Sequence, residues 1–214
     1  MSVTAGIGKG RRRYNAAGRR ERALQQRDAA LDQARALFLE RGYVATTVEA
    51  IASASGISAA TVYKTYGGKA GLVRQLCEIA LAGSEPTHTH DRSDALRQNV
   101  DPRAVLEGWG ALLAEVSPRF SPLLLLLRSA AQTDRDAAAL LGDLDQDRLD
   151  RMTENARFLS DGGHLRDGVT LESARDILWF CSSAEFYDLL IVRRGWTPDQ
   201  LGRFATETMI AALL

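Results

Sequence analysis

The chain has 214 residues, of which 45% are apolar and 25% charged, and this composition excludes wholesale disorder. Its apolar runs, such as residues 123–127 and 209–214, are at most six residues long and far shorter than the roughly 20 residues needed to cross a bilayer, and the first thirty residues hold no apolar core of a signal peptide. Two cysteines, Cys77 and Cys181, are too few for a secreted disulfide scaffold, so we expect a cytoplasmic protein without a membrane segment.

The charge of the chain sums to zero but is divided unevenly along it. Residues 1–83 hold thirteen basic and six acidic side chains, whereas residues 84–214 hold fourteen basic and twenty-one acidic ones. A basic N-terminal module followed by an acidic remainder favours a polyanionic partner for the first part alone.

Residues 1–24 form the most basic segment and are rich in glycine, which predicts a disordered arm. Such an arm can settle on phosphates or enter a minor groove once the protein has docked on DNA. Arg11, Arg12 and Arg13 are therefore candidate DNA contacts.

Residues 25–83 have the pattern of a helical DNA-binding domain. Apolar residues at helical spacing predict a helix over 25–41, which Gly42 ends. Thr46-Thr47-Val48-Glu49 predicts a capping box that starts a helix at Thr47, and after Gly56 a further helix runs from Ser58 to Tyr66. Two short helices joined by a glycine-containing turn indicate a helix-turn-helix, and Lys69 begins a fourth helix.

Residues 84–101 show no apolar period and predict a linker loop. The pair His88 and His90 is one residue apart, but the neighbouring sequence supplies no further metal ligands, so we expect no metal site. Helical patterns resume at 102–116, 122–132, 134–159, 171–194 and 198–214, and Pro102, Pro118, Pro122 and Pro198 fall where helices are expected to start. With no alternating strand pattern, the predicted fold class is all-α.

The N-terminal motifs resemble the DNA-binding domain of the tetracycline-repressor (TetR) family over about residues 27–82. The resemblance rests on Ala34-Arg35-Ala36-Leu37-Phe38, Gly42-Tyr43, Thr46-Thr47, Ile51-Ala52, Gly56-Ile57-Ser58, Thr61-Val62-Tyr63 and Tyr66-Gly67-Gly68-Lys69. It implies that the recognition helix 58–66 enters a major groove while neighbouring groups hold phosphates. The candidate DNA contacts are Thr47, Ser58, Ala59, Ala60, Thr61, Tyr63, Lys64, Tyr66 and Lys69. Of these, the resemblance implies backbone phosphate contacts for Thr47, Tyr63 and Lys69.

The C-terminal segment resembles the last two helices of many TetR regulators. This resemblance rests on Trp179, Glu185, Tyr187-Asp188-Leu189-Leu190, Gly195-Trp196-Thr197-Pro198 and the closing Met209-Ile210-Ala211-Ala212-Leu213-Leu214. It implies a homodimer through a four-helix bundle, and the apolar surface of these helices exceeds what one helix pair buries.

The resemblance also implies that residues 102–214 enclose a cavity for a small effector. Aromatic and aliphatic residues at helical spacing are more often core than pocket, and we expect a subset of them to line the cavity. Scarce buried charge favours an apolar or amphipathic effector. The candidate lining residues are Trp109, Leu113, Phe120, Leu124, Leu127, Trp179, Ser183, Phe186 and Tyr187.

These observations predict a ligand-responsive regulator, a repressor that binds an inverted-repeat operator in double-stranded DNA as a homodimer and is released by its effector. Two alternatives stay open. A nucleoid-type protein would use the basic arm for sequence-tolerant binding. An all-helical enzyme is disfavoured because no catalytic spacing accompanies Cys77, Cys181 and His164. We expect neither a cofactor nor a metal.

Overall fold

The computed structural model describes residues 8–83 and 87–214, without the side chains of residues 8–17, 19, 23 and 24. The chain folds as two compact units, residues 1–72 and 73–214. The sequence placed the boundary later, at the 84–101 linker. This boundary falls inside helix α4 (Lys69–Ala82), so the chain passes from one unit to the other within a single helix.

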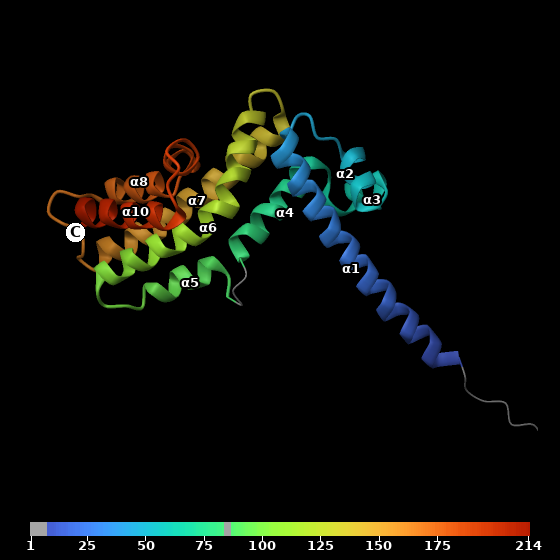
Figure 1. Ribbon diagram of the computed structural model, residues 1–214. Coiled ribbons are helices and arrows are strands. Elements are labelled where there is room, and N and C mark those ends of the chain that lie inside the picture. Colours follow the sequence, from blue (N-terminus) through green and yellow to red (C-terminus); the bar gives the residue numbers. More distant parts are fainter. Residues whose placement is uncertain (1–7, 84–86) are drawn as a thin grey trace, which may run out of the picture. The chain divides into compact units, whose positions relative to one another are not determined.

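The first unit contains α1 (Gly8–Arg41), α2 (Val48–Ser55) and α3 (Ala59–Tyr66), with the first residues of α4. Helix α2 packs on α1 and α3 packs on α2 (Figure 1). The predicted apolar face of α1 is confirmed, because Ala30, Ala34 and Phe38 are fully buried, and Ile51 and Val62 join them. Gly42, Gly56 and Gly67 follow the three helices with φ of +82°, +70° and +76°, a conformation that glycine adopts at low cost.

Two details of this unit differ from the sequence prediction. Helix α1 begins at Gly8 instead of Gln25, so residues 8–24 are helical where a disordered arm was expected, and residues 1–7 lie outside the described part. A helix anchored by its packed C-terminal half can extend into a polar sequence at little cost, because the nucleation step has already occurred. The N-cap of α2 is Thr47, and not Thr46 as expected. Thr46 is buried instead, and its hydroxyl donates to the carbonyl oxygens of Leu37 and Gly42.

The second unit is a bundle of helices around one core. After α4, its elements are α5 (Thr89–Leu96), α6 (Pro102–Ala130), α7 (Arg135–Asp161), α8 (Leu171–Cys181), α9 (Ala184–Tyr187), the π-helix η1 (Asp188–Arg193) and α10 (Pro198–Leu213). Helix α6 packs against α10, α7 and α5, and α8 packs against α7 and α10 (Figure 1). The core contains Leu106, Leu159, Leu178, Leu201 and Leu213, each at most 2% exposed.

Three predicted elements of the second unit are corrected by the structure. The predicted 84–101 loop contains α5, whose first residue Thr89 donates its hydroxyl to the carbonyl oxygen of Leu81. The two helices predicted over 102–132 are one helix, with Pro118 and Pro122 in its interior instead of at a helix start. Burial of α6 on both sides of each proline, at Val116 and Leu123 for example, offsets the lost backbone hydrogen bonds.

The third correction concerns residues 171–194, which were predicted as one helix. They divide into α8, α9 and η1, because the side chain of Ser183 accepts a hydrogen bond from the amide of Phe186 and starts a new helix. Among the described helices, α6 alone has the length and apolar composition to cross a membrane. Its buried face packs on α10, which is the arrangement of a core helix.

Candidate nucleic-acid interface and cavity

The recognition helix α3 is oriented by a cap at its start and a core residue in its middle. The amide of Thr61 donates to Ser58 Oγ over 3.1 Å, and the Ser58 and Thr61 hydroxyls lie 2.8 Å apart. Val62 is fully buried, as predicted. The opposite face therefore presents Ala60, Thr61 and Lys64 to solvent, with Ala59 half-buried beside them.

Two of the predicted phosphate contacts are accessible. Thr47 is exposed at the start of α2, and its hydroxyl accepts a hydrogen bond from the amide of Ala50 over 3.1 Å. Tyr63 is 53% exposed, so its phenol is not a core residue. A capped helix N-terminus beside an exposed phenol is a suitable surface for an anionic oxygen.

The third predicted phosphate contact, Lys69, and the candidate DNA contact Tyr66 are engaged inside the first unit. Lys69 donates to the carbonyl oxygen of Tyr43 over 2.9 Å, and its ammonium lies 4.3 Å from the centroid of the Tyr43 ring. Tyr66 donates to the carbonyl oxygen of Arg27 over 3.2 Å, and partial burial raises the pKa of its phenol. Both side chains therefore also join elements of the DNA-binding unit. Arg11, Arg12 and Arg13 belong to α1, but their side chains lie outside the described part.

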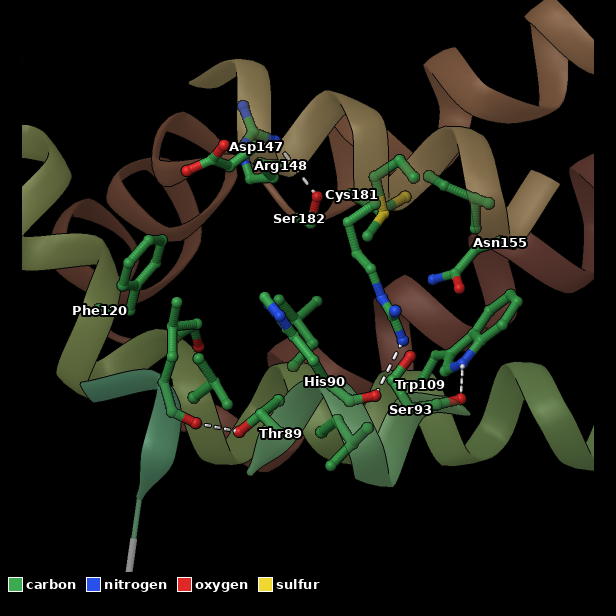
Figure 2. A pocket seen from close by; sticks show the side chains of 18 of the residues that line it. Thr89, His90, Ser93, Trp109, Phe120, Asp147, Arg148, Asn155, Cys181 and Ser182 are labelled. Atoms are coloured by element: carbon green, nitrogen blue, oxygen red, sulfur yellow. Dashed lines mark hydrogen bonds between the residues drawn. The ribbon is translucent and has the colours of Figure 1, made fainter. Parts of the chain in front are cut away.

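The second unit holds a cavity of about 490 Å³ (Figure 2). Its walls come from the end of α4 and from α5, α6, α7, α8 and α10. Of the residues predicted to line it, Trp109, Leu113 and Phe120 do so, together with their α6 neighbours Leu112 and Val116.

The remaining predicted lining residues lie elsewhere in the second unit. Leu124 and Leu127 are at most 1% exposed and Phe186 and Tyr187 at most 9%, and none of the four lines the cavity. Ser183 caps α9. Trp179 is 36% exposed, and its ring lies 4.7 Å from the Arg148 guanidinium carbon. Helical spacing identified the apolar faces of these helices but not which apolar residues border an empty space.

Sequence analysis missed a polar wall of the cavity that α5 and α7 supply. It includes Arg148, Arg151 and Asn155, which recur at intervals of three and four residues and so share one face of α7. Arg148 donates to the carbonyl oxygen of Trp179 over 2.6 Å, to Ser182 Oγ over 3.2 Å and to Asp145 over 3.2 Å. The i, i+3, i+7 spacing of these residues was the signal in the sequence that could have indicated a polar face on this helix.

Arg151 joins the polar wall to α5. Its guanidinium donates to the carbonyl oxygen of His90 over 2.9 Å and forms ion pairs with Asp94 and with Glu154. The hydrogen bond from Arg151 holds the pKa of the Asp94 carboxyl below its ordinary value. Burial lowers the pKa of the His90 imidazole, and the Arg151 charge lowers it further. The rings of His88 and His90 meet edge to face at 4.9 Å, and within the described ranges no group of three His, Cys, Asp or Glu side chains could hold a metal ion.

Residues 30–76 match the family model described as bacterial regulatory proteins, tetR family. The chain is 34% identical over 109 residues to the HTH-type transcriptional regulator AlkX of Mycobacterium tuberculosis. This alignment spans half of the present chain and half of that relative.

Solved structures share the fold over most of the chain. A SmeT–triclosan complex, SmeT being the repressor of the Stenotrophomonas maltophilia efflux pump SmeDEF, has a TM-score of 0.67 and 23% identity, covering 87% of this chain and 90% of that one. NalD, the secondary repressor of the MexAB-OprM pump in Pseudomonas aeruginosa, has a TM-score of 0.66 and 22% identity, covering 90% of this chain and 98% of that one. Residues 30–76 therefore carry the DNA-binding domain of the tetR family of bacterial regulatory proteins, and the chain as a whole shares the fold of these solved structures.

Proposed function

We propose that this protein is a cytoplasmic transcriptional repressor that binds an inverted-repeat operator as a homodimer and releases it when a small molecule occupies the cavity of the second unit. The observation that carries the proposal is the combination of a tetR-type helix-turn-helix with a cavity of about 490 Å³ in a separate unit of the same chain. One part then has a surface for DNA and the other a space for a ligand, which are the two sites that a ligand-responsive regulator needs.

The chemistry of α3 supports modest base readout and stronger positioning on phosphates. Ala59 and Ala60 offer methyl groups suited to thymine, and Thr61 and Lys64 offer hydrogen-bond donors. Thr47 and Tyr63 are accessible for backbone phosphates, which orient a protein on DNA without specifying sequence. Two copies of α3 held at a fixed spacing would double the base contacts.

A homodimer is supported by an aromatic cluster at the surface, formed by Phe180 of α8, Phe186 of α9 and Phe204 of α10. Phe180 and Phe204 are 54% and 41% exposed, although Phe180 meets the buried Phe186 edge to face at 5.4 Å between centroids and Phe204 stacks on it at 5.9 Å. Leu189 and Val192 of η1 are also more than half exposed. Apolar surface of this extent is typical of an interface, and a second copy of the chain offers a matching one.

Three similar proteins support the presence of a ligand site and the regulatory role. The SmeT structure contains triclosan, a small molecule, and SmeT and NalD are repressors of efflux pumps. The AlkX relative is a transcriptional regulator. Together they support the role of a small-molecule-responsive repressor for the present chain.

The experiment is a binding titration with the full chain and the DNA upstream of its own gene. Footprinting locates the protected inverted repeat, and fluorescence anisotropy then compares that duplex with a scrambled duplex of the same length. We expect a preference of at least about a thousandfold for the repeat at physiological salt. Equal affinity for both duplexes would overturn the proposal and favour a sequence-tolerant DNA binder.

A truncated chain tests the contribution of the basic N-terminus. Deleting residues 1–22 removes seven cations and one anion, so affinity for both duplexes should fall and depend less on salt. The fold should persist, because Ala30 is the first described residue of α1 that is buried. A truncated chain that loses only its affinity for the scrambled duplex would assign the segment to non-specific binding.

A further inference from the structure

The cavity wall contains a group of buried polar atoms without partners. Among the described side chains, four nitrogen or oxygen atoms are shielded from solvent and have no hydrogen bond: Ser117 Oγ, Arg148 Nε, Arg151 Nε and Asn155 Oδ1. All four residues line the cavity. Leaving a buried polar atom without a hydrogen bond is costly, so proteins seldom gather several in one place without a reason.

The charges of the two arginines on this wall are already balanced by the protein. Both terminal nitrogens of Arg148 and of Arg151 donate to protein oxygens, and each guanidinium has a carboxylate partner, Asp145 for Arg148 and Asp94 for Arg151. Asp147 and Asp150 also line the cavity, and neither forms an ion pair with another described residue. An anionic ligand would therefore meet additional carboxylates and no free cation, and burying its charge would be costly.

The unsatisfied atoms also require both kinds of hydrogen-bonding group. The two Nε atoms are donors, Asn155 Oδ1 is an acceptor, and Ser117 Oγ can be either. A carboxylate only accepts and an ammonium only donates, so each would leave part of the wall unsatisfied. A hydroxyl or a primary amide both donates and accepts, and it carries no charge.

Apolar and aromatic side chains line much of the rest of the cavity, beside polar residues such as Thr89, Ser93 and Ser121. The apolar lining includes Trp109, Leu113 and Phe120 of α6, Leu178 of α8 and Met209 of α10. Trp109 and Phe120 lie on different sides of the open space (Figure 2). We infer that the cavity accepts an uncharged amphipathic molecule, with an aromatic or aliphatic body against α6 and one hydroxyl or amide head at the Ser117, Arg151 and Asn155 side. This inference rests on the proposed function, in which the cavity holds the effector.

Three probes with the same apolar body and different heads test the inference. They are 4-hexylphenol, which is neutral at pH 7, 4-hexylbenzoate, which is anionic, and 4-hexylbenzylammonium, which is cationic. Calorimetric titration of the full chain should show the phenol binding at least about tenfold more tightly than either ion, because the benzoate would meet carboxylates without a free cation and the ammonium has no acceptor for the two Nε donors. Tighter binding of the benzoate or of the benzylammonium, or binding of none of the three, would overturn the inference.

A substitution locates the head group. Asn155→Leu should weaken 4-hexylphenol about tenfold and leave 4-hexylbenzene, which lacks a head, bound at least as well as before. Gln132→Leu is the control, because Gln132 is an exposed amide that follows α6 and does not line the cavity. Unchanged phenol affinity in Asn155→Leu, with a thermal unfolding curve like that of the wild type, would remove the polar wall from recognition.

The same samples distinguish failure of the inference from failure of the proposed function. Operator affinity of the ligand-free chain depends on the first unit, so it tests the regulator role without any probe. An intact operator preference with the wrong probe ranking would overturn the ligand class alone. Loss of operator preference would overturn the proposed function, whatever the probes do.

Discussion

Lys69 shows how a single residue can serve both the fold and the candidate interface. Sequence reasoning assigned it to phosphate, whereas in the structure its ammonium is held between the carbonyl oxygen and the ring of Tyr43. The contact joins the start of α4 to the segment between α1 and α2. The position of the ammonium is therefore fixed before DNA arrives, which lowers the entropy lost on binding.

Replacing Lys69 by alanine should have two effects. Loss of the hydrogen bond and of the cation–π contact should lower the free energy of unfolding by about 1 kcal/mol. Operator affinity should fall without a change in base preference, and the log–log salt slope should decrease by about one unit. Urea unfolding and anisotropy at several salt concentrations measure the two effects.

Lys64→Ala is the control for this prediction. Lys64 is exposed on α3 and forms neither an ion pair nor a side-chain hydrogen bond with the described residues, so its loss should leave stability within about 0.5 kcal/mol. A Lys69→Ala protein with an unchanged salt slope would remove Lys69 from the DNA interface and leave it a purely structural role.

Cys181 allows a test of the cavity wall by thiol chemistry. Burial raises the pKa of the Cys181 thiol from 9.0 to about 11. At pH 8 its thiolate fraction is then roughly a hundredfold below that of an ordinary thiol, and it rises about tenfold per pH unit up to the shifted pKa. In a Cys77→Ala background, the reaction of Cys181 with an aromatic disulfide reagent should be slow at pH 8, and its rate should rise about tenfold per pH unit. Bound 4-hexylphenol should slow the reaction further.

Two measurements complete the thiol test. The same protein in denaturant should react at the rate of an exposed thiol, which shows that the cysteine is chemically intact. A native rate that levels off near pH 9, or that does not respond to the probe, would mean that Cys181 is not on the wall of a ligand cavity.

Glycine determines how closely two elements of the second unit approach. Helices α6 and α10 cross at Gly110 and Gly202, where a Cβ added to Gly202 would lie 2.7 Å from the carbonyl oxygen of Gly110 and 2.8 Å from the Cβ of Ala114. The backbones are thus in contact without intervening side chains. Because α6 lines the cavity and α10 carries Phe204, this contact fixes the cavity relative to the aromatic cluster.

Gly202→Ala should therefore separate α6 from α10 and lower the free energy of unfolding by about 1–3 kcal/mol. Gly142→Ala in α7 is the matched control, because a Cβ there meets nothing within 4 Å. Removing an unneeded helical glycine should raise stability by about 0.5–1 kcal/mol. Urea unfolding of both variants measures the difference, and a shift of the same sign in both would show that α6 and α10 are not in tight contact.

The elements that sequence predicted well are those with a strong apolar period and a clear stop signal. Helices α2, α3 and α7 begin and end within about two residues of the expected positions, because Gly56, Gly67 and the cap at Asp134 are local signals. Helix α5 and the continuity of α6 through Pro118 were missed, because tertiary packing, which the local sequence does not contain, stabilises both. The polar wall of α7 was missed although the spacing of Arg148, Arg151 and Asn155 places them on one helix face, because that spacing does not show whether the face borders a cavity or solvent.

At the scale of the whole molecule, dimerisation is the step that would place two recognition helices on one DNA site. Phe204→Arg puts a charge into the aromatic cluster, next to Phe186 and Trp196. We expect the variant to be a monomer in sedimentation at concentrations where the wild type is a dimer, because an unpaired charge is costly in an apolar interface. The operator affinity of this variant should fall, since a monomer can contact only one half-site of the inverted repeat.

Val100→Arg controls for the introduced charge. Val100 is 90% exposed and lies between α5 and α6, outside the aromatic cluster, so this variant should stay dimeric. A monomeric Phe204→Arg protein with undiminished operator affinity would contradict a dimeric mode of binding.

The central claim is that the cavity of one unit controls the DNA affinity of the other. The most direct measurement is operator affinity of the full chain with the cavity empty and with it saturated by 4-hexylphenol, paired with probe affinity in the absence and presence of operator. Coupling free energy is reciprocal, so we expect both affinities to fall by the same factor, about 5- to 150-fold. Operator affinity that stays constant while calorimetry shows a filled cavity would contradict the account.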